Sequence, residues 1–460
     1  MRNQNFFFSV LIFSLLALGF GCKASTAEQA AAVRPVTVNY WTVFNDVAEL
    51  KKRATEYKAI YPNVTVNIKQ VRYEEFDRLF INALADDVQP DIVSIHTRWL
   101  KKYEPRLSPL PASTQMGKLV QTSSITKETT VVVDTNILPT VQNLQKEYVS
   151  AVPEDVIKGA AIYGLPLAVD TLGVYYNQTL LDKAGIPEPP KTWDDFLIAV
   201  KAITKLDKDG KILQSGVALG TGANIDNSFD IVSALFMQSG ITMSSKGAVG
   251  FGVGLEKNLA VTHPALQTLN FYTNFARPTT ELYSWNEEQT TAFDAFVRGK
   301  VAFYFGFGYE YKRIVARAPE MQMGILPLFQ TDKTKQVNVA NYWIESVTKK
   351  SKNKNEASDF IRFLSTPENL KKYSDTTKQP SPLRMHLKAE QADPIIKAFA
   401  DQLLVAKNWY KGDDIQATEN AFDAMIHTVL INDPTLDARK LMERDANAIL
   451  RAAAVAAQTF

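Results

Sequence analysis

Strand-like and helix-like segments alternate between Pro35 and Ile95, and this order constrains the fold more than any other feature of the sequence. Residues 35–41, 64–68 and 92–95 are short β-prone runs, whereas 47–61 and 73–85 place apolar residues at helical spacing. A strand, a helix and a second strand in this order form a parallel pair, with the helix packed on the sheet. The pattern predicts an α/β fold whose carboxyl strand ends are open to a ligand.

Aromatic and polar residues follow two of these predicted strands, at the ends where a ligand is expected. The segment 41–45 (Trp-Thr-Val-Phe-Asn) follows the first strand, and Arg98 and Trp99 follow the third. Arg98 offers a planar fork of donors that suits paired hydroxyl groups. Trp41 and Trp99 each fit two roles equally well, because a tryptophan in such a loop either packs beneath it or stacks on a ligand.

The segment Ala161–Asn177 contains a carboxylate between two strand-like runs. A Gly-Leu-Pro turn leads into a short apolar run, Asp170 interrupts it, and a second β-prone run ends at Asn177. Burying a carboxylate there is costly unless it accepts hydrogen bonds. We interpret the segment as a strand that crosses between two lobes, with Asp170 facing the cleft between them. The alternative is that Asp170 caps a turn.

The N-terminus has the pattern of a secretory signal. Arg2 precedes an apolar run from Phe6 to Phe20, which is too short for a stable membrane-spanning helix. Cys22, the only cysteine, follows directly, and residues 18–22 (Leu-Gly-Phe-Gly-Cys) resemble a bacterial lipobox in which Cys22 is lipidated. We therefore expect a signal peptide over 1–21 and a lipid-anchored polar tether over 22–35. The alternative is a chance cysteine in a discarded signal.

Composition and motifs exclude several classes of function. The chain has 460 residues, 22% of them charged, and a net charge of +2 with no basic cluster, so nucleic acid is not an expected partner. Its four histidines are far apart, and neither a G-x-S-x-G elbow nor an HExxH helix occurs, so we expect no metal and no cofactor. A pair of carboxylates for glycoside hydrolysis remains conceivable, but 49 acidic residues make that signal weak.

Several tryptophans and one tyrosine fall in loops rather than in apolar stripes. They come after predicted strands or before predicted helices, and they are Trp41, Trp99, Tyr309, Trp343 and Trp409. Flat aromatic rings combined with planar polar groups suit a sugar, which has apolar faces and hydroxyl edges. Such a set also suits a receptor without catalytic activity, since it stabilises the bound ground state.

Two consecutive stretches resemble a known family. The run G-L-P-x-x-x-D-x-x-x-x-Y-Y-N at 164–177 and the run LLDKAGIPEPPKTWDDF at 180–196 are similar to the extracellular solute-binding proteins of ABC importers, in the sugar-binding, maltose-binding-protein-like group. The resemblance extends from about Val36 to the C-terminal helices. It implies a two-lobed periplasmic-binding-protein-like α/β fold, in which each lobe is a mostly parallel sheet flanked by helices and the ligand cleft lies between the lobes.

The resemblance also implies a division of the chain and a set of ligand contacts. The N-terminal lobe is expected to comprise 36–168 plus 331–384 and the C-terminal lobe 169–330 plus 385–460, with crossings near Asp170, Gln330 and Arg384. Tyr309 takes the place of a stacking tryptophan in relatives, and Trp343 is retained from a Gly-Gly-Trp strand whose glycines are absent here. The expected ligand-binding residues are Trp41, Asn45, Arg98, Trp99, Asp170, Asn224, Tyr309, Trp343 and Trp409.

The expected function is that of a monomeric, non-enzymatic lipoprotein on the outer face of the cytoplasmic membrane. It would capture a carbohydrate, most simply an oligosaccharide, and deliver it to the permease subunits of an ABC transporter by hinge closure. Two alternatives stay open at this point. One is a secreted carbohydrate-active enzyme, and the other is a receptor for a non-sugar solute such as a polyamine or a peptide.

Overall fold

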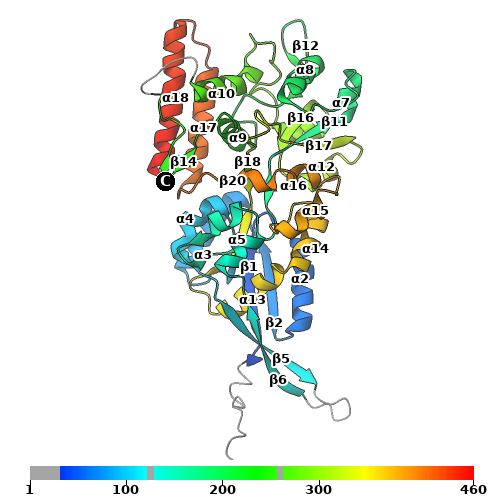
Figure 1. Ribbon diagram of the computed structural model, residues 1–460, viewed down its shortest axis with the longest axis vertical. Coiled ribbons are helices and arrows are strands. Elements are labelled where there is room, and N and C mark those ends of the chain that lie inside the picture. Colours follow the sequence, from blue (N-terminus) through cyan, green and yellow to red (C-terminus); the bar gives the residue numbers. More distant parts are fainter. Residues whose placement is uncertain (1–31, 122–128, 256–262) are drawn as a thin grey trace, which may run out of the picture.

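The protein folds into two lobes, each with its own sheet and its own hydrophobic core (Figure 1). This computed structural model describes residues 32–121, 129–255 and 263–460. Within those ranges, no helix combines the length and the apolar character needed to cross a membrane. The expected signal peptide and Cys22 lie outside the described residues.

The first lobe is built on the predicted alternation of strands and helices. Its sheet has the order β2 (Val64–Gln70), β1 (Val36–Thr42), β3 (Ile92–His96), β19 (Trp343–Thr348) and β4 (Leu107–Ser108), with β9 (Leu165–Pro166) also paired to β19. Strand β1 runs parallel to β2 and β3, as predicted, and β19 runs antiparallel to β3. Helices α2 (Val47–Ile60) and α3 (Tyr73–Ala85) connect the parallel strands, and the Asp46 carboxylate caps α2 by accepting from the Glu49 amide at 3.0 Å.

The second lobe has a mixed sheet, which differs from the mostly parallel sheet expected there. Its order is β12 (Lys205–Leu206), β13 (Ile212–Val217), β16 (Val301–Gly306), β11 (Gly173–Asn177) and β17 (Met323–Pro327). Only β13 and β16 pair in parallel. The chain enters this sheet in β11 directly from the first lobe, and β11 then lies between β16 and β17 and runs opposite to both.

A third, small sheet connects the two lobes. Strand β10 (Asp170–Thr171) pairs antiparallel with β18 (Asn338–Asn341), and β18 pairs parallel with β20 (Ala406–Lys407). Buried side chains change from one core to the other at these three strands, so they mark the three passages between lobes. The first passage lies at Asp170, as predicted.

The other two passages differ from the predicted crossings near Gln330 and Arg384. They lie at 338–341 and at 406–409, because Leu387, Ile396 and Leu403 pack in the first core and hold the preceding segment there. The segment 385–406 was expected in the second lobe, but most of its buried apolar side chains pack in the first core, and Phe399 packs in the second. The remaining domain limits stay a prediction.

Helices cover both sheets. Those of the first lobe and the hinge region are α4 (Leu100–Tyr103), α5 (Val141–Glu147), α6 (Ala151–Val156), α13 (Lys354–Leu364), α14 (Pro367–Thr377), α15 (Leu387–Glu390) and α16 (Lys397–Ala400). Those of the second lobe are α7 (Gln178–Lys183), α8 (Trp193–Ile203), α9 (Ser228–Gln238), α10 (Pro264–Thr273), α11 (Ala292–Val297), α12 (Glu310–Arg317), α17 (Ile415–Leu430) and α18 (Ala438–Gln458). The short strands outside the main sheets are β7 (Ile157–Lys158), β8 (Ala161–Ile162), β14 (Ser244–Ser245) and β15 (Ala248–Val249).

A hairpin projects from the first lobe on the side away from the second (Figure 1). It consists of β5 (Ser113–Gln121) and β6 (Thr129–Ile137), which form a separate two-stranded sheet.

Candidate functional site

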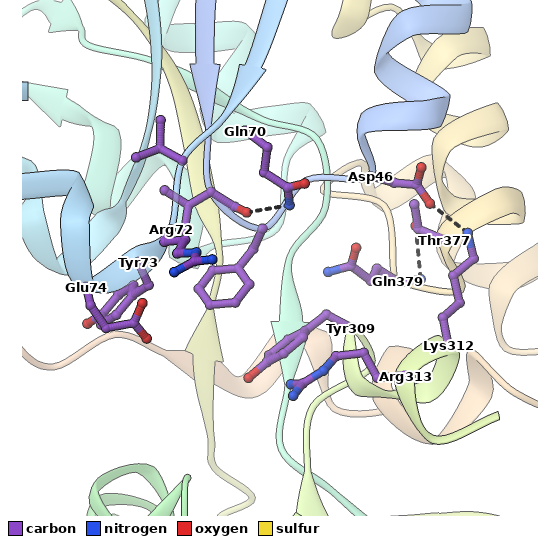
Figure 2. A pocket seen from close by; sticks show the side chains of 13 residues that line it. Asp46, Gln70, Arg72, Tyr73, Glu74, Tyr309, Lys312, Arg313, Thr377 and Gln379 are labelled. Atoms are coloured by element: carbon purple, nitrogen blue, oxygen red, sulfur yellow. Dashed lines mark hydrogen bonds and ion pairs between the residues drawn. The ribbon is translucent and has the colours of Figure 1, made fainter. Parts of the chain in front are cut away.

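The cleft between the lobes contains two adjoining cavities that share the side chains of Phe44, Tyr73 and Tyr309. The first, which we call the Lys312 compartment, measures about 630 Å³ and takes residues from the ends of β1 and β2 and from α12 (Figure 2). The second, the Arg98 compartment, measures about 340 Å³ and lies between the end of β3 and helices α9 and α17. Both lobes therefore contribute to each compartment, as a site that responds to hinge closure requires.

Aromatic rings line the boundary of the two compartments. The Phe44 ring lies 5.4 Å from Trp343 and 5.8 Å from Tyr309, measured between ring centroids. Trp99 stacks on Tyr73 at 5.2 Å and meets Trp343 edge-on at 5.2 Å. Phe44 is 47% exposed, so a large apolar face is open to the cleft. These rings give the cleft flat apolar surfaces next to polar ones.

An ion pair between the lobes crosses the Arg98 compartment. The Arg98 guanidinium is buried, donates to the Asp230 carboxylate on α9, and lies 3.7 Å from the Glu419 carboxylate on α17. Burial raises the pKa of Glu419 to about 7, although Arg98 opposes that rise. Burial also lowers the pKa of His96 to about 3, so its ring is neutral where it bonds to Asn341 at 2.6 Å.

A second, more exposed ion pair crosses the Lys312 compartment. The Lys312 ammonium on α12 lies 2.7 Å from the Asp46 carboxylate of the first lobe (Figure 2). The amide of Gln70 donates to the Val43 carbonyl at 3.0 Å and holds the loop that carries Phe44. Ion pairs therefore connect the two lobes on both sides of the aromatic boundary.

Four of the residues predicted from sequence meet in this cleft. Arg98, Trp99, Tyr309 and Trp343 all line the Arg98 compartment, and Tyr309 also lines the Lys312 compartment.

Sequence reasoning missed Phe44 and Tyr73 as site residues. Both follow strands β1 and β2 at the edge where a ligand was expected, so the position of the strand ends was the available signal.

Asp170 does not face the cleft, contrary to the prediction. It is 1% exposed, and its carboxylate accepts from the backbone amides of Gly308 and Tyr309, both at 2.8 Å. Burial raises its pKa to about 6, while these donors oppose the rise. A side chain on Gly308 would approach the Asp170 oxygen to 2.7 Å, so glycine permits this contact. Asp170 thus supports the turn that presents Tyr309.

Three other predicted residues lie outside the two compartments. Trp409 is 7% exposed in the second core, and its indole donates to the Ser233 hydroxyl at 3.0 Å. Asn224 fixes a turn, since its amide donates to the carbonyls of Asn286 and Gln289. Trp41 is half-buried on β1, with the Lys69 ammonium 4.6 Å from its ring. A direct role for these three in ligand binding stays a prediction that their positions do not support.

Asn45 lies at the edge of the site and joins a buried polar network beneath it. Its amide donates to Glu345 at 2.7 Å and to Ser94 at 3.2 Å, and Tyr40 donates to Glu345 at 2.5 Å. Glu345 is fully buried on β19, two residues after Trp343. Burial raises its pKa to about 7, although its three donors oppose the rise. The network fixes the loop between Phe44 and Asp46 at the mouth of the cleft.

Stability is therefore expected to depend on the protonation of Glu345. A carboxyl with a pKa of about 7 in the folded protein and 4.5 in the unfolded chain takes up a proton on folding between these pH values. The free energy of unfolding should then fall as the pH rises from about 4.5 to about 7, and stay flat above that. Replacing Glu345 by glutamine should remove on the order of 1–3 kcal/mol of this pH dependence.

Urea unfolding at acidic and at neutral pH would measure this effect. Asp170, Glu310 and Glu419 are carboxyls whose pKa values also rise on burial, to about 6, about 7 and about 7, so the Glu345→Gln protein retains a smaller slope from them. A Glu345→Gln protein with the full wild-type slope would contradict the assignment.

Among the described residues, no group of three or more histidine, cysteine, aspartate or glutamate side chains could hold a metal ion.

Comparison with known proteins gives a consistent result. The sequence profile of the family described as bacterial extracellular solute-binding protein matches residues 41–371. The arabinooligosaccharide-binding protein of Bacillus subtilis is 24% identical over 212 residues, which cover 45% of this chain and 43% of that protein.

Solved structures share the fold over nearly the whole chain. A cyclo/maltodextrin-binding protein complexed with maltotetraose has a TM-score of 0.65 at 16% identity, covering 92% of this chain and 97% of that one. UgpB from Mycobacterium tuberculosis in complex with glycerophosphocholine has a TM-score of 0.68 at 15% identity, covering 91% and 98%. At these identities the likeness establishes the two-lobed fold alone.

Proposed function

The chain belongs to the bacterial extracellular solute-binding proteins, and we propose that it captures a carbohydrate in the cleft between its lobes and delivers it to an ABC transporter permease. One observation supports the choice of ligand above the others. The rings of Phe44, Tyr309 and Trp343 meet at one boundary, with carboxylates and a guanidinium within the same cavity.

Sugar rings match this combination of surfaces. Their apolar faces stack on aromatic rings, and their hydroxyl edges bond to carboxylates and guanidinium groups such as those of Asp226, Asp423 and Arg98. The names of similar proteins agree, since one is an arabinooligosaccharide-binding protein and another was solved with maltotetraose. The two compartments together offer room for more than one sugar unit, which favours an oligosaccharide.

A glycan panel tests the proposal. A glycan that binds only the folded protein should raise its melting temperature, and calorimetry should then give one molecule bound per chain. The glycan should be recovered intact, since a secreted carbohydrate-active enzyme would cleave it. If polyamines or peptides stabilise the protein and no glycan does, the carbohydrate proposal fails and the receptor has a different ligand.

Removing the Tyr309 side chain should weaken glycan binding. We expect Tyr309→Ala to cost about 1–3 kcal/mol of binding free energy, because it deletes a ring that both compartments share. Tyr309→Phe should retain most of the affinity, since it keeps the stacking face. Tyr163→Ala, which removes a half-buried tyrosine outside the two compartments, is the matched control. Calorimetry that finds equal affinities in all three variants would contradict this role.

We further propose that Cys22 is lipidated and anchors the protein on the outer face of the cytoplasmic membrane. The support is the apolar leader and the lipobox-like sequence that precede it. Wild-type protein should fractionate with membranes, and Cys22→Ala should abolish lipid attachment as measured by mass spectrometry. Recovery of wild-type protein without lipid, entirely from the medium, would contradict the anchor.

A further inference from the structure

The hairpin of β5 and β6 extends beyond the packed body of the first lobe. Its two strands pair in register from Ser113 with Ile137 to Gln121 with Thr129, and they hydrogen-bond to no other strand among the described residues. In Figure 1 the hairpin points away from the second lobe and from the cleft. An isolated two-stranded hairpin has little stability in water on its own, so something must hold it.

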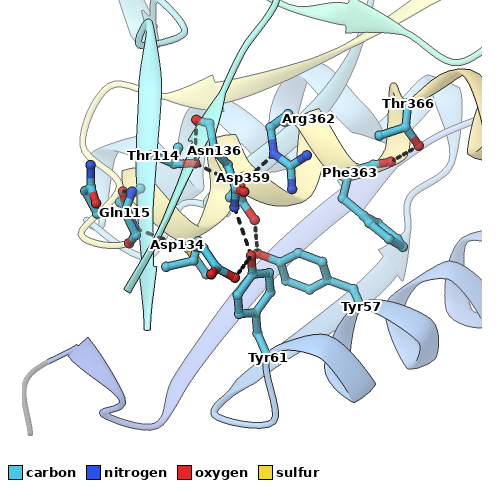
Figure 3. Close-up of polar contacts among 12 residues, drawn as sticks. Tyr57, Tyr61, Thr114, Gln115, Asp134, Asn136, Asp359, Arg362, Phe363 and Thr366 are labelled. Carbon is cyan, nitrogen blue, oxygen red and sulfur yellow. Dashed lines mark hydrogen bonds and ion pairs between the residues drawn. The ribbon is translucent and has the colours of Figure 1, made fainter. Parts of the chain in front are cut away.

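The base of the hairpin is fixed to the first lobe by a buried carboxylate. Asp359 on α13 is fully buried and accepts from the Thr114 hydroxyl and the Asn136 amide, each at 2.8 Å, one from either strand (Figure 3). It also accepts from the Tyr57 hydroxyl at 2.8 Å, which joins the hairpin to α2. The hairpin is therefore a built projection with a fixed direction.

The outer half of the hairpin exposes four large apolar side chains. Leu119 is 58% exposed, Val120 37%, Val132 38% and Val133 45%, and none of the four belongs to either hydrophobic core. Residues directly opposite each other share a face and successive residues alternate, so Leu119 and Val133 lie on one face of the hairpin, and Val120 and Val132 lie on the other. A projection with exposed apolar side chains on both of its faces is expected to contact something else.

The first described residue of the chain, Ala32, lies at the hairpin. Ala32 lies directly against Gly117, where any side chain would overlap the Ala32 backbone. Cys22 is 10 residues before Ala32 in the sequence. An extended chain spans at most about 3.5 Å per residue, so a lipid on Cys22 lies within roughly 35 Å of Gly117. The strands themselves extend about 14 Å beyond Gly117, at about 3.4 Å per residue.

We propose that the outer half of this hairpin contacts the headgroup region of the bilayer to which Cys22 is anchored. This inference rests on the proposed lipid anchor. The tether keeps the hairpin close to the bilayer, and transfer of the Leu119, Val120, Val132 and Val133 side chains from water stabilises the contact. The first lobe would then lie closer to the membrane than the second. The hairpin contact and the tether to Cys22 together restrict the orientations that the cleft can adopt.

Fluorescent labels on the full-length, lipidated chain test this contact. Cys22 is the only native cysteine, so Leu119→Cys and Val133→Cys each provide one free thiol once Cys22 is lipidated. Leu213→Cys is the matched control, because Leu213 is also 58% exposed but lies on β13 of the second lobe. The labelled proteins are reconstituted in vesicles of phosphatidylethanolamine and phosphatidylglycerol and titrated with iodide, a water-soluble quencher.

Labels at 119 and 133 should show blue-shifted emission and severalfold weaker quenching than the label at 213. Equal quenching at the three sites in anchored protein would overturn the proposal. Protection that persists in detergent solution and rises with protein concentration would also overturn it, since it would indicate a second copy on the hairpin. If mass spectrometry finds Cys22 without lipid, the anchor and the contact fail together. Glycan binding by the same samples stays measurable, so carbohydrate capture is judged separately.

Discussion

In Asp170→Ala protein we expect the free energy of unfolding to fall by about 2–4 kcal/mol, because two buried backbone amides lose their acceptor. The amides are those of Gly308 and Tyr309, and both donate to the Asp170 carboxylate at 2.8 Å. The same bonds hold the turn that presents Tyr309 to the cleft, so glycan affinity should fall as well. Urea unfolding and calorimetry on the same preparation would measure the two effects.

Two further variants separate these bonds from a general loss of charge. Asp170→Asn keeps one acceptor oxygen but places an amide donor against the second backbone amide, so its loss of stability should be smaller than that of Asp170→Ala. Asp182→Ala, which removes an exposed carboxylate from α7, should leave both stability and affinity unchanged. An unfolding midpoint in Asp170→Ala equal to that of the wild type would contradict the role assigned to this residue.

Local patterns in the sequence were sufficient to predict the three parallel strands of the first sheet, β1, β2 and β3. The helix expected over 73–85 has those limits in the structure. These features depend on side-chain periodicity and on hydrogen bonds within a few residues. The mixed sheet of the second lobe was not predictable in the same way, since strand direction there depends on where the chain enters from the first lobe.

The candidate site was predicted in part, for a related physical reason. Aromatic residues in loops were expected at the cleft, and Tyr309 and Trp343 do lie there, but Trp409 packs in the second core. A tryptophan has the same local sequence signal in either place, and only the surrounding helices decide which applies. Asp170 was identified as unusual because a carboxylate between apolar runs needs donors. Its donors come from a turn 138 and 139 positions away, which no local pattern specifies.

Replacing Arg98 by alanine should open the ligand-free protein. Arg98 and Asp230 belong to different lobes and are both buried, so removal of the guanidinium leaves the Asp230 carboxylate without its partner. The carboxyl of Glu419 lies in the same compartment and would then face Asp230 without an intervening cation. Breaking such a pair should destabilise the closed form by about 2–4 kcal/mol. Because the proposed glycan site spans both lobes, the affinity for glycan should fall by about 30- to 1000-fold.

Small-angle scattering would detect the opening as a larger radius of gyration in the absence of glycan, and saturating glycan should reduce it again. Lys312→Ala provides the comparison, since it breaks the other pair between the lobes, whose lysine side chain is 45% exposed. An exposed pair contributes about 0–1 kcal/mol, so this variant should remain close to the wild type.

Combining Arg98→Met with Asp230→Leu should restore closure, because an apolar pair of similar volume leaves no buried charge unpaired. If Arg98→Ala keeps the wild-type radius and affinity, closure of the cleft does not depend on this ion pair.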